Sequence, residues 1–445
     1  MSIASELTTL ATNKANIKVA IQSKSPLIEP TEVLSHWPTS IGSIFVNVDD
    51  EKPVRFIDFD GTVLHSYTVE EAQGLEELPV LPTHDGLTCQ GWNYTLQQMN
   101  DTISDTGYCD VGATYVPTDG KTHIHITVRE PEYKTFSLKF KQSRDDGVEI
   151  DWGDGTSQTY MGTSTQIVSH QYSPDSYPQS YDVTLEILDG TLEFPENIMG
   201  INASTQSTSN PVSALQSMID AIYLGGGITT LGNNIFRSCY SLKYLTLPDG
   251  VATVGQWATR FCTQLLSMVL PRTLTSLGLQ SMSYCYGLRL VSIPPSLTEI
   301  SAQLFQFCHS LKRIAYPSTV TRIQSRATNG CDSLQFVALP HSITYIDQLM
   351  FYQCSSFKSV RLPNSVAQIY QQAFKDCTTM QGIKFPSGLT KIQSEVFSGC
   401  YGIVKYDFSD ATQVPTLDNV NAFYNTNVNK KIVVPDALYE DWKAA

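Results

Sequence analysis

Two aspartates have the spacing of a catalytic pair. The segment VRFIDFDGTVL at residues 54–64 carries Asp58 and Asp60 at the end of an apolar run that predicts a strand. Carboxylates two residues apart at a strand end can divide two roles, with Asp58 as a nucleophile and Asp60 as a general acid/base. The pair therefore raises the question of an enzyme.

This segment resembles the nucleophile motif of the haloacid dehalogenase phosphatases. That superfamily requires a doubly wound sheet with further Ser/Thr, Lys and acidic motifs downstream, and we find none of these before the next region begins. A hairpin fits the same residues, with strands at 43–48, 54–59 and 62–67 and a turn at Asp60-Gly61. We expect the hairpin and no enzymatic activity, so the phosphatase is a distant alternative.

A second group of acidic residues lies in the stretch IDWGDGT, within residues 121–192. Short alternating strands and turn signals there predict a β-sandwich. The stretch resembles a PKD-type immunoglobulin-like domain, with Trp152 as a core residue. Asp151 and Asp154 could hold Ca²⁺, but a tight turn with satisfied aspartates is the favoured interpretation. We expect no metal and no cofactor.

Eight cysteines recur every 23 residues in the C-terminal half of the chain. They are Cys239, Cys262, Cys285, Cys308, Cys331, Cys354, Cys377 and Cys400. A fixed period of this length indicates a solenoid, in which one unit is stacked on itself. Metal sites need clustered, mixed ligands, and disulfides between neighbouring units would distort the stack, so we expect reduced, buried packing residues. Cys89 and Cys109 lie outside this ladder.

Apolar residues six and eight positions after each cysteine predict a short strand in every unit. Proline at the ninth position of seven units ends that strand, because proline cannot donate to the ladder. Sequences such as SLKYLTLP and VTRIQ resemble leucine-rich repeats of the BspA type over residues 222–410. The resemblance implies a solenoid fold that is common in adhesins and in secreted or phage-borne recognition proteins.

Positions five and seven after each cysteine are expected to face solvent from the strand. Among them, five aromatic or basic residues are predicted to bind the ligand: Tyr244, Arg313, Phe336, Arg361 and Lys384. On an acidic chain such a stripe could meet an anionic glycan or a protein, and the alternative is an ordinary solvated surface. Arg322 and Arg326 could extend the patch on another face.

The N-terminal region combines a helix with a phage-like module. Residues 1–25 predict an amphipathic helix, which either anchors or oligomerises the chain or packs on its own domain. The sequence from DFDGT through HDGLT and QGWN to DGKTHIHI resembles a module of virion proteins from tailed phages of gut bacteria, over residues 40–130. In such a module His84 and Trp92 would be structural.

The whole chain is predicted to be a multidomain, mainly β protein. The expected parts are a helical anchor at 1–45, a small α+β virion module at 46–120, a PKD-like sandwich at 121–192, a linker or cap at 193–221, the solenoid at 222–410 and a C-terminal cap at 411–445. The net charge of −14 and the lack of any basic run disfavour nucleic-acid binding. No stretch is apolar enough for a signal peptide or a membrane span.

These features lead us to expect a structural virion protein, a head or tail fibre made in the host cytoplasm and exposed on the particle. Its partners would be other virion proteins at the N-terminal region, a host-surface glycan or protein at the repeats, and further copies of itself. The alternative is a bacterial surface adhesin of the BspA type.

Overall fold

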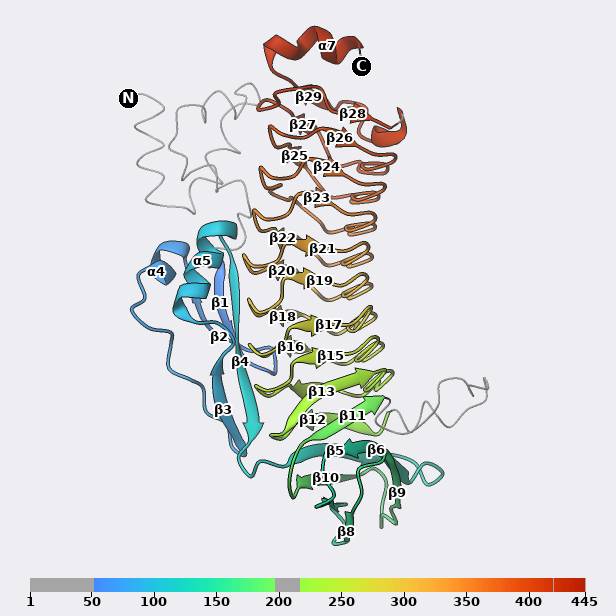
Figure 1. Ribbon diagram of the computed structural model, residues 1–445. Helices are drawn as coiled ribbons and strands as arrows, with labels where there is room; N and C mark the ends of the chain where they lie inside the picture. The colour runs from blue at the N-terminus through green and yellow to red at the C-terminus, as the bar shows by residue number, and fades with distance from the viewer. Residues whose placement is uncertain (1–51, 197–216, 419, 445) are drawn as a thin grey trace. The chain divides into compact units, whose positions relative to one another are not determined.

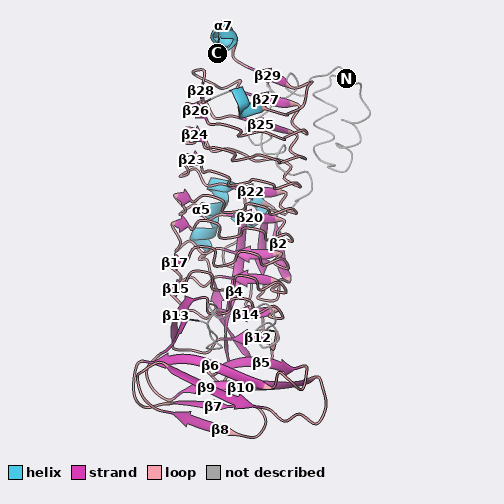
Figure 2. Cartoon of the chain, turned by 90° about the vertical axis from the view of Figure 1, so that its right-hand side faces the viewer, coloured by secondary structure: helices cyan, strands magenta, loops and turns pink. Residues whose placement is uncertain are grey.

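The computed structural model describes residues 52–196, 217–418 and 420–444. All of them belong to one compact unit that spans residues 50–445. The expected helix at 1–25 and strand at 43–48 lie outside the described residues. The described part is mainly β with a few short helices, and within it no helix has the length and apolar character needed to cross a membrane (Figures 1 and 2).

Each 23-residue unit forms one rung, and all but the unit of Cys354, which has no front-row strand, carry short strands on two sides. The front row contains β14 (Tyr244–Thr246), β16 (Ser267–Val269), β18 (Leu290–Ser292), β20 (Arg313–Ala315), β22 (Phe336–Ala338), β25 (Gly382–Lys384) and β27 (Lys405–Asp407). The back row contains β15 (Thr253–Val254), β17 (Ser276–Leu277), β19 (Glu299–Ile300), β21 (Arg322–Ile323), β23 (Tyr345–Ile346), β24 (Gln368–Ile369) and β26 (Lys391–Ile392). Front-row strands occupy the predicted positions after every repeat cysteine except Cys354, and rungs pair in parallel at a register of one repeat, as in Arg313 beside Phe336.

A continuous apolar core runs through the stacked rungs. Equivalent side chains lie on one another, and the rings of Phe351, Phe374 and Phe397 stack with centroids 5.1 and 5.5 Å apart. Phe423 extends this column by one more ring, 5.6 Å from Phe397. No rung encloses these side chains alone, so stability depends on contacts between neighbours.

The cysteine ladder adds a hydrogen bond to this packing. Each of the seven cysteines from Cys262 to Cys400 donates its thiol to a backbone carbonyl of the preceding rung, at 2.9–3.2 Å. Cys331, for example, donates to the Phe305 carbonyl at 3.0 Å. Cysteine is small and apolar yet still carries a donor, so it can add a second hydrogen bond to a carbonyl that already accepts a backbone amide, as at Phe305. All ten cysteines are reduced, so the prediction of reduced packing residues is confirmed.

Burial should make these thiols unreactive. It raises the pKa of Cys354 to about 12, and Cys89 is the one cysteine that is not fully buried. Titration of the folded protein with a thiol reagent near pH 8 should therefore modify one thiol at most, and none in Cys89→Ser. In the guanidinium-denatured chain all ten thiols should react with the reagent. Rapid modification of several thiols in the folded protein would contradict the buried ladder.

Residues 122–196, termed here the β segment, cover the first rung of the solenoid. Their strands are β5 (Thr122–Val128), β6 (Thr135–Gln142), β7 (Val148–Asp151), β8 (Ser157–Tyr160), β9 (Gln166–Gln171), β10 (Gln179–Ile187) and β11 (Leu192–Glu196). The solenoid begins with β12 (Ile219–Tyr223) and β13 (Ile228–Asn233).

The β segment and the solenoid share two six-stranded sheets. One has the order β14-β12-β5-β10-β7-β8, and the other has the order β17-β15-β13-β11-β6-β9. Strand β12 pairs antiparallel with β5, and β13 pairs parallel with β11. The open edges of the first rung are therefore hydrogen-bonded instead of exposed, which meets the need of a solenoid for a capped end. The expected linker at 193–221 contributes strand residues at both of its ends.

Residues 53–117, termed here the α/β segment, form a separate small sheet. Its strands β1 (Val54–Ile57), β2 (Val63–Tyr67), β3 (Leu87–Trp92) and β4 (Cys109–Pro117) have the order β2-β1-β4-β3. Helices α4 (Val69–Gln73) and α5 (Leu96–Thr106) each begin with a capping box, at Thr68 and Thr95. Strand β4 lies against the front row of the solenoid (Figure 1). Strands β1 and β2 pair antiparallel, so the hairpin prediction is confirmed for these two strands.

The other end of the solenoid is closed by the C-terminal residues. These form β28 (Thr416–Leu417), η3 (Val420–Phe423), β29 (Lys431–Val433), η4 (Asp436–Leu438) and α7 (Tyr439–Ala444). Strand β29 extends the front row by pairing with β27, and the Trp442 ring lies 4.5 Å from that of Phe408. The last rung therefore has its apolar side covered.

Truncating a core residue in the middle of the stack should be costly. Leu311 is fully buried, and Leu311→Ala should lower the free energy of unfolding by about 2–5 kcal/mol through lost burial and an unfilled cavity. Val404→Ala, at an exposed site of the same array, is the matched control and should change stability little. Urea denaturation of the three proteins measures both values. A Leu311→Ala protein that unfolds like the parent would show that this residue is not in the core.

Candidate binding surface

The structure divides the five predicted ligand-binding residues into two groups. Arg361 and Lys384 are exposed. Tyr244 is half-buried, with its ring 6.2 Å from that of Phe59 in the α/β segment. Arg313 and Phe336 are 5% and 2% exposed, so the prediction that they face solvent is wrong.

The α/β segment buries these side chains because it covers the front row between Tyr244 and Phe336. The Phe336 ring packs on Tyr108 at a centroid distance of 4.3 Å. Gly112 on β4 allows the closest approach, since a Cβ there would lie 2.5 Å from Val269 and 2.9 Å from Ser292. Glycine is required at this point because the side chains of Val269 and Ser292 fill the space that a Cβ would need.

A buried ion pair fixes the α/β segment on the solenoid. Arg313 donates from Nη2 to Asp110 Oδ1 at 2.6 Å and to the Pro53 carbonyl at 2.7 Å. Arg55 binds the same carboxylate through Nε and Nη2, at 2.8 and 3.0 Å. Burial opposes ionisation of Asp110, but the two guanidinium groups outweigh it and hold the pKa of Asp110 below its usual value. Arg313 is therefore a structural residue of this contact.

Neutral hydrogen bonds continue the contact along the row. Asn93 donates from Nδ2 to the Leu270 carbonyl and to Ser292 Oγ, both at 2.8 Å. Ser292 Oγ donates to the Asp110 carbonyl at 2.6 Å, and the Tyr94 hydroxyl donates to the Ile293 carbonyl at 2.7 Å. Such bonds satisfy the polar groups that the contact removes from water. The front row over these rungs is consequently an internal interface.

The rungs beyond Phe336 present a different front surface, termed here the C-terminal front surface. It carries four basic residues: Arg361, Lys384, Lys405 and Lys431. Lys384 is 2.8 Å from Asp410, and Lys405 is 3.2 Å from Asp407. Lys405 and Lys431 are neighbours in the parallel register. The exposed apolar side chains of Val404 and Ile432 lie on the same rungs. This combination of cations and apolar groups suits an anionic or amphipathic ligand.

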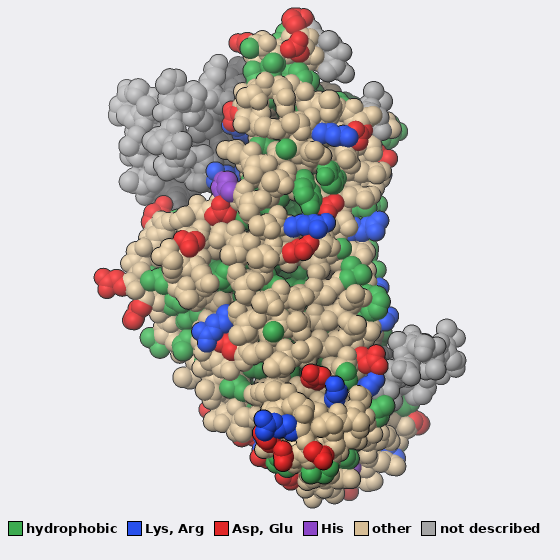
Figure 3. Space-filling model, viewed as in Figure 1, with side chains coloured by type: hydrophobic (Ala, Val, Ile, Leu, Met, Phe, Trp, Pro, Cys, Tyr) green, Lys and Arg blue, Asp and Glu red, His purple; other side chains and the backbone are tan. Residues whose placement is uncertain are grey.

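Charge is scattered on the face of the molecule that Figure 3 shows. In Figure 3 the basic side chains lie singly, mostly next to acidic ones, and do not gather into one field. Arg322 on the back row, for example, pairs with Glu299 at 3.3 Å. It therefore belongs to a different side of the array from Arg361 and Lys384.

The aspartates considered for catalysis and for Ca²⁺ serve turns. Asp58 accepts from the Phe59 amide at 2.8 Å and lies 2.7 Å from His84 Nε2. Asp60 accepts from the Thr62 amide at 2.8 Å. Asp154 similarly binds the Thr156 amide and hydroxyl, at 3.1 and 2.6 Å. The bonds of Asp60 and Asp154 are those of Asx turns, in which the carboxylate accepts the amide two residues on.

Residues 215–335 and 300–429 match the family described as BspA type leucine rich repeat region. The solenoid is a BspA-type leucine-rich repeat array. No curated protein matches the chain.

Several solved structures of leucine-rich repeat proteins are similar to it. The Treponema pallidum leucine rich repeat protein is 25% identical, over 51% of this chain and 88% of that one, with a TM-score of 0.30. A leucine rich cell surface protein from Faecalibacterium prausnitzii is 19% identical, over 61% and 96% of the two chains, with a TM-score of 0.28. The pneumococcal vaccine antigen PcpA is 15% identical, over 48% and 68%, with a TM-score of 0.30.

Two groups of residues were not predicted from the sequence: the polar residues that join the α/β segment to the solenoid, and a cluster of two histidines and an aspartate in the β segment. The first group, including Asn93 and Asp110, has no local signature because its partners are about two hundred residues away in the sequence. The second group had a signal in the alternation THIHITV at 122–128, which places His123 and His125 on one face of a strand.

Removing the buried guanidinium should loosen the α/β segment. Arg313→Ala leaves the Asp110 carboxylate with one partner instead of two, and loss of a partner from a buried pair costs about 3–5 kcal/mol. Hydrogen exchange should increase selectively in residues 53–117. Arg361→Ala, an exposed cation of the same row, should leave that exchange unchanged. Equal protection of 53–117 in the two variants would show that the pair does not hold the segment.

Proposed function

We propose that this chain is a non-enzymatic recognition protein that binds a cell-surface ligand through the C-terminal front surface. The observation that carries the proposal is the unequal cover of the front row. One part is occupied by the protein's own α/β segment, and the rest presents Arg361, Lys384, Lys405 and Lys431. Solenoids bind along such a sheet surface, which offers many small contacts in a fixed order.

The bacterial surface adhesin is the form of this function that the BspA-type repeats support best. Its ligand would be an anionic glycan or a protein with an acidic surface. A virion fibre is the second candidate, and the resemblance of residues 40–130 to phage virion modules favours it. In that case the N-terminal region would bind other virion proteins and the repeats would meet the host.

Localisation distinguishes the two forms. Immunogold labelling with an antibody against residues 222–410, together with mass spectrometry of purified phage particles and of bacterial envelopes, would locate the chain. Label on the envelope and absence from particles would favour the adhesin. Label projecting from particles would favour the fibre.

Charge reversal on the C-terminal front surface tests the binding proposal itself. Arg361→Glu with Lys384→Glu should weaken attachment of the purified protein to target cells by about tenfold or more, because two attractions become repulsions. Added salt should weaken the parent's attachment through screening. Arg322→Glu is the matched control, since it reverses one exposed, ion-paired cation on the back row. Unchanged attachment in the double variant would place the binding surface elsewhere.

A further inference from the structure

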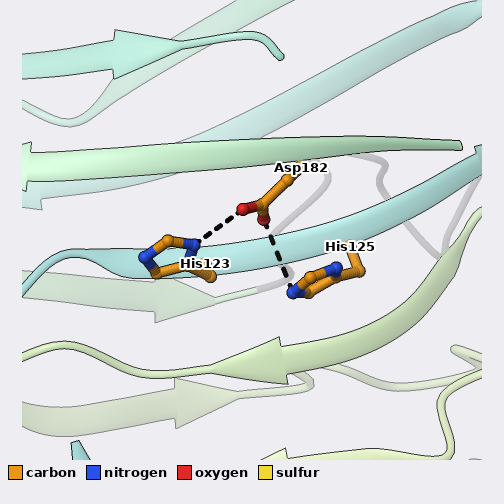
Figure 4. Close-up of side chains that lie close together, drawn as sticks. All are labelled: His123, His125 and Asp182. Atoms are coloured by element: carbon orange, nitrogen blue, oxygen red, sulfur yellow. Dashed lines mark hydrogen bonds and ion pairs between the residues drawn. The ribbon is translucent and has the colours of Figure 1, made fainter. Parts of the chain in front are cut away.

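Two histidines and an aspartate converge on the outer face of the β segment. His123 and His125 are two residues apart on β5, so their side chains leave the same face of the strand. Asp182 on the neighbouring strand β10 is directly opposite His125 in the antiparallel register. Figure 4 shows both imidazoles directed at the Asp182 carboxylate. In the described part of the chain, this is the one group of three such residues close enough to share an ion.

The separations of their ligand atoms suit a tetrahedral metal. His123 Nδ1 lies 2.8 Å from Asp182 Oδ2, and His125 Nε2 lies 3.6 Å from Asp182 Oδ1. One ligand atom from each residue can be chosen so that all lie within 4.8 Å of one another. Ligands at the usual zinc distances are roughly 3.3 Å apart in a tetrahedron. Only small side-chain adjustments would therefore admit the ion.

The Asp182 carboxylate is incompletely satisfied. Its Oδ1 atom is buried and accepts no hydrogen bond from any described residue, because His125 Nε2 at 3.6 Å is beyond hydrogen-bond range. Buried acceptors are nearly always paired, and an ion is one way to meet the requirement. This oxygen and the nitrogen facing it leave the gap that a cation would fill.

The surroundings orient both imidazoles. Asp119 lies 3.1 Å from His123 Nε2, on the opposite side of the ring from the nitrogen that faces Asp182. Metal-binding histidines commonly donate their second ring N–H to such a carboxylate, which fixes the tautomer and leaves the other nitrogen as the ligand. The ring of Tyr223 on β12 contacts His125 edge to face at 5.3 Å. The cluster thus has the outer support that metal ligands need.

We propose that His123, His125 and Asp182 bind a divalent transition-metal ion, with Zn²⁺ as the best-suited ion. Two imidazoles and one carboxylate are a zinc ligand set, and the partial exposure of all three leaves a fourth position for solvent. The ion would join β5 to β10 in the sheet that continues through β12 into the solenoid. Its effect would be to strengthen the junction at the first rung.

The test uses the full chain after removal of metals with a chelator. Titration with Zn²⁺ against a chromophoric competitor should show one saturable site, and the melting temperature should rise with Zn²⁺ concentration. His125→Ala and Asp182→Asn should abolish both effects. Asp119→Asn should weaken binding by about 10–100-fold, because it removes support and not a ligand.

His309→Ala is the matched control. His309 also faces an aspartate, Asp332, at 2.8 Å, but it belongs to no three-residue cluster within the described ranges. The His309→Ala protein should bind Zn²⁺ with the same affinity as the parent. Circular dichroism of each metal-free variant establishes that it is folded, and Co²⁺ substitution gives a visible absorption band that is sensitive to the ligands. Absence of a saturable site, or equal binding in the parent and folded His125→Ala, would overturn the proposal.

Discussion

A repeat unit of this protein cannot bury its own apolar side chains, and the rest of the structure follows from that constraint. Each rung contributes one cysteine and several other apolar residues to a core that is complete only when the next rung is present. The thiol ladder links neighbouring rungs further, because each cysteine from Cys262 to Cys400 donates to a carbonyl of the rung before it. Both ends then need cover, which the β segment and the C-terminal residues provide.

The repeat is also the part that could be predicted from sequence. The 23-residue spacing of Cys239 through Cys400 gives the period, and the proline after each strand gives the position of the front row. Reduced cysteines and the hairpin of β1 with β2 also follow from local patterns. These inferences succeed because neighbouring residues, or residues one period apart, determine the structure.

The docking of the α/β segment could not be predicted in this way. Arg313 occupies a strand position that faces solvent in an isolated array, and only a segment two hundred residues earlier in the chain makes it buried. Phe336 and Tyr108 depend on each other in the same manner. No local pattern distinguishes Arg313 from Arg361, although one is internal and the other exposed. The predicted stripe therefore includes two side chains, Arg313 and Phe336, that the α/β segment buries.

The α/β segment contacts the solenoid from Asp249, whose backbone amide donates to Gln90 Oε1, to His341, whose ring pairs with Asp105. Stacked repeats ordinarily communicate only with adjacent repeats, so they can fray one at a time. A rigid body bound along several rungs acts as a splint, since no rung beneath it can open without breaking contacts shared with the others. Cooperative unfolding should therefore extend over the splinted rungs, and independent opening should be confined to the rungs that follow Phe336.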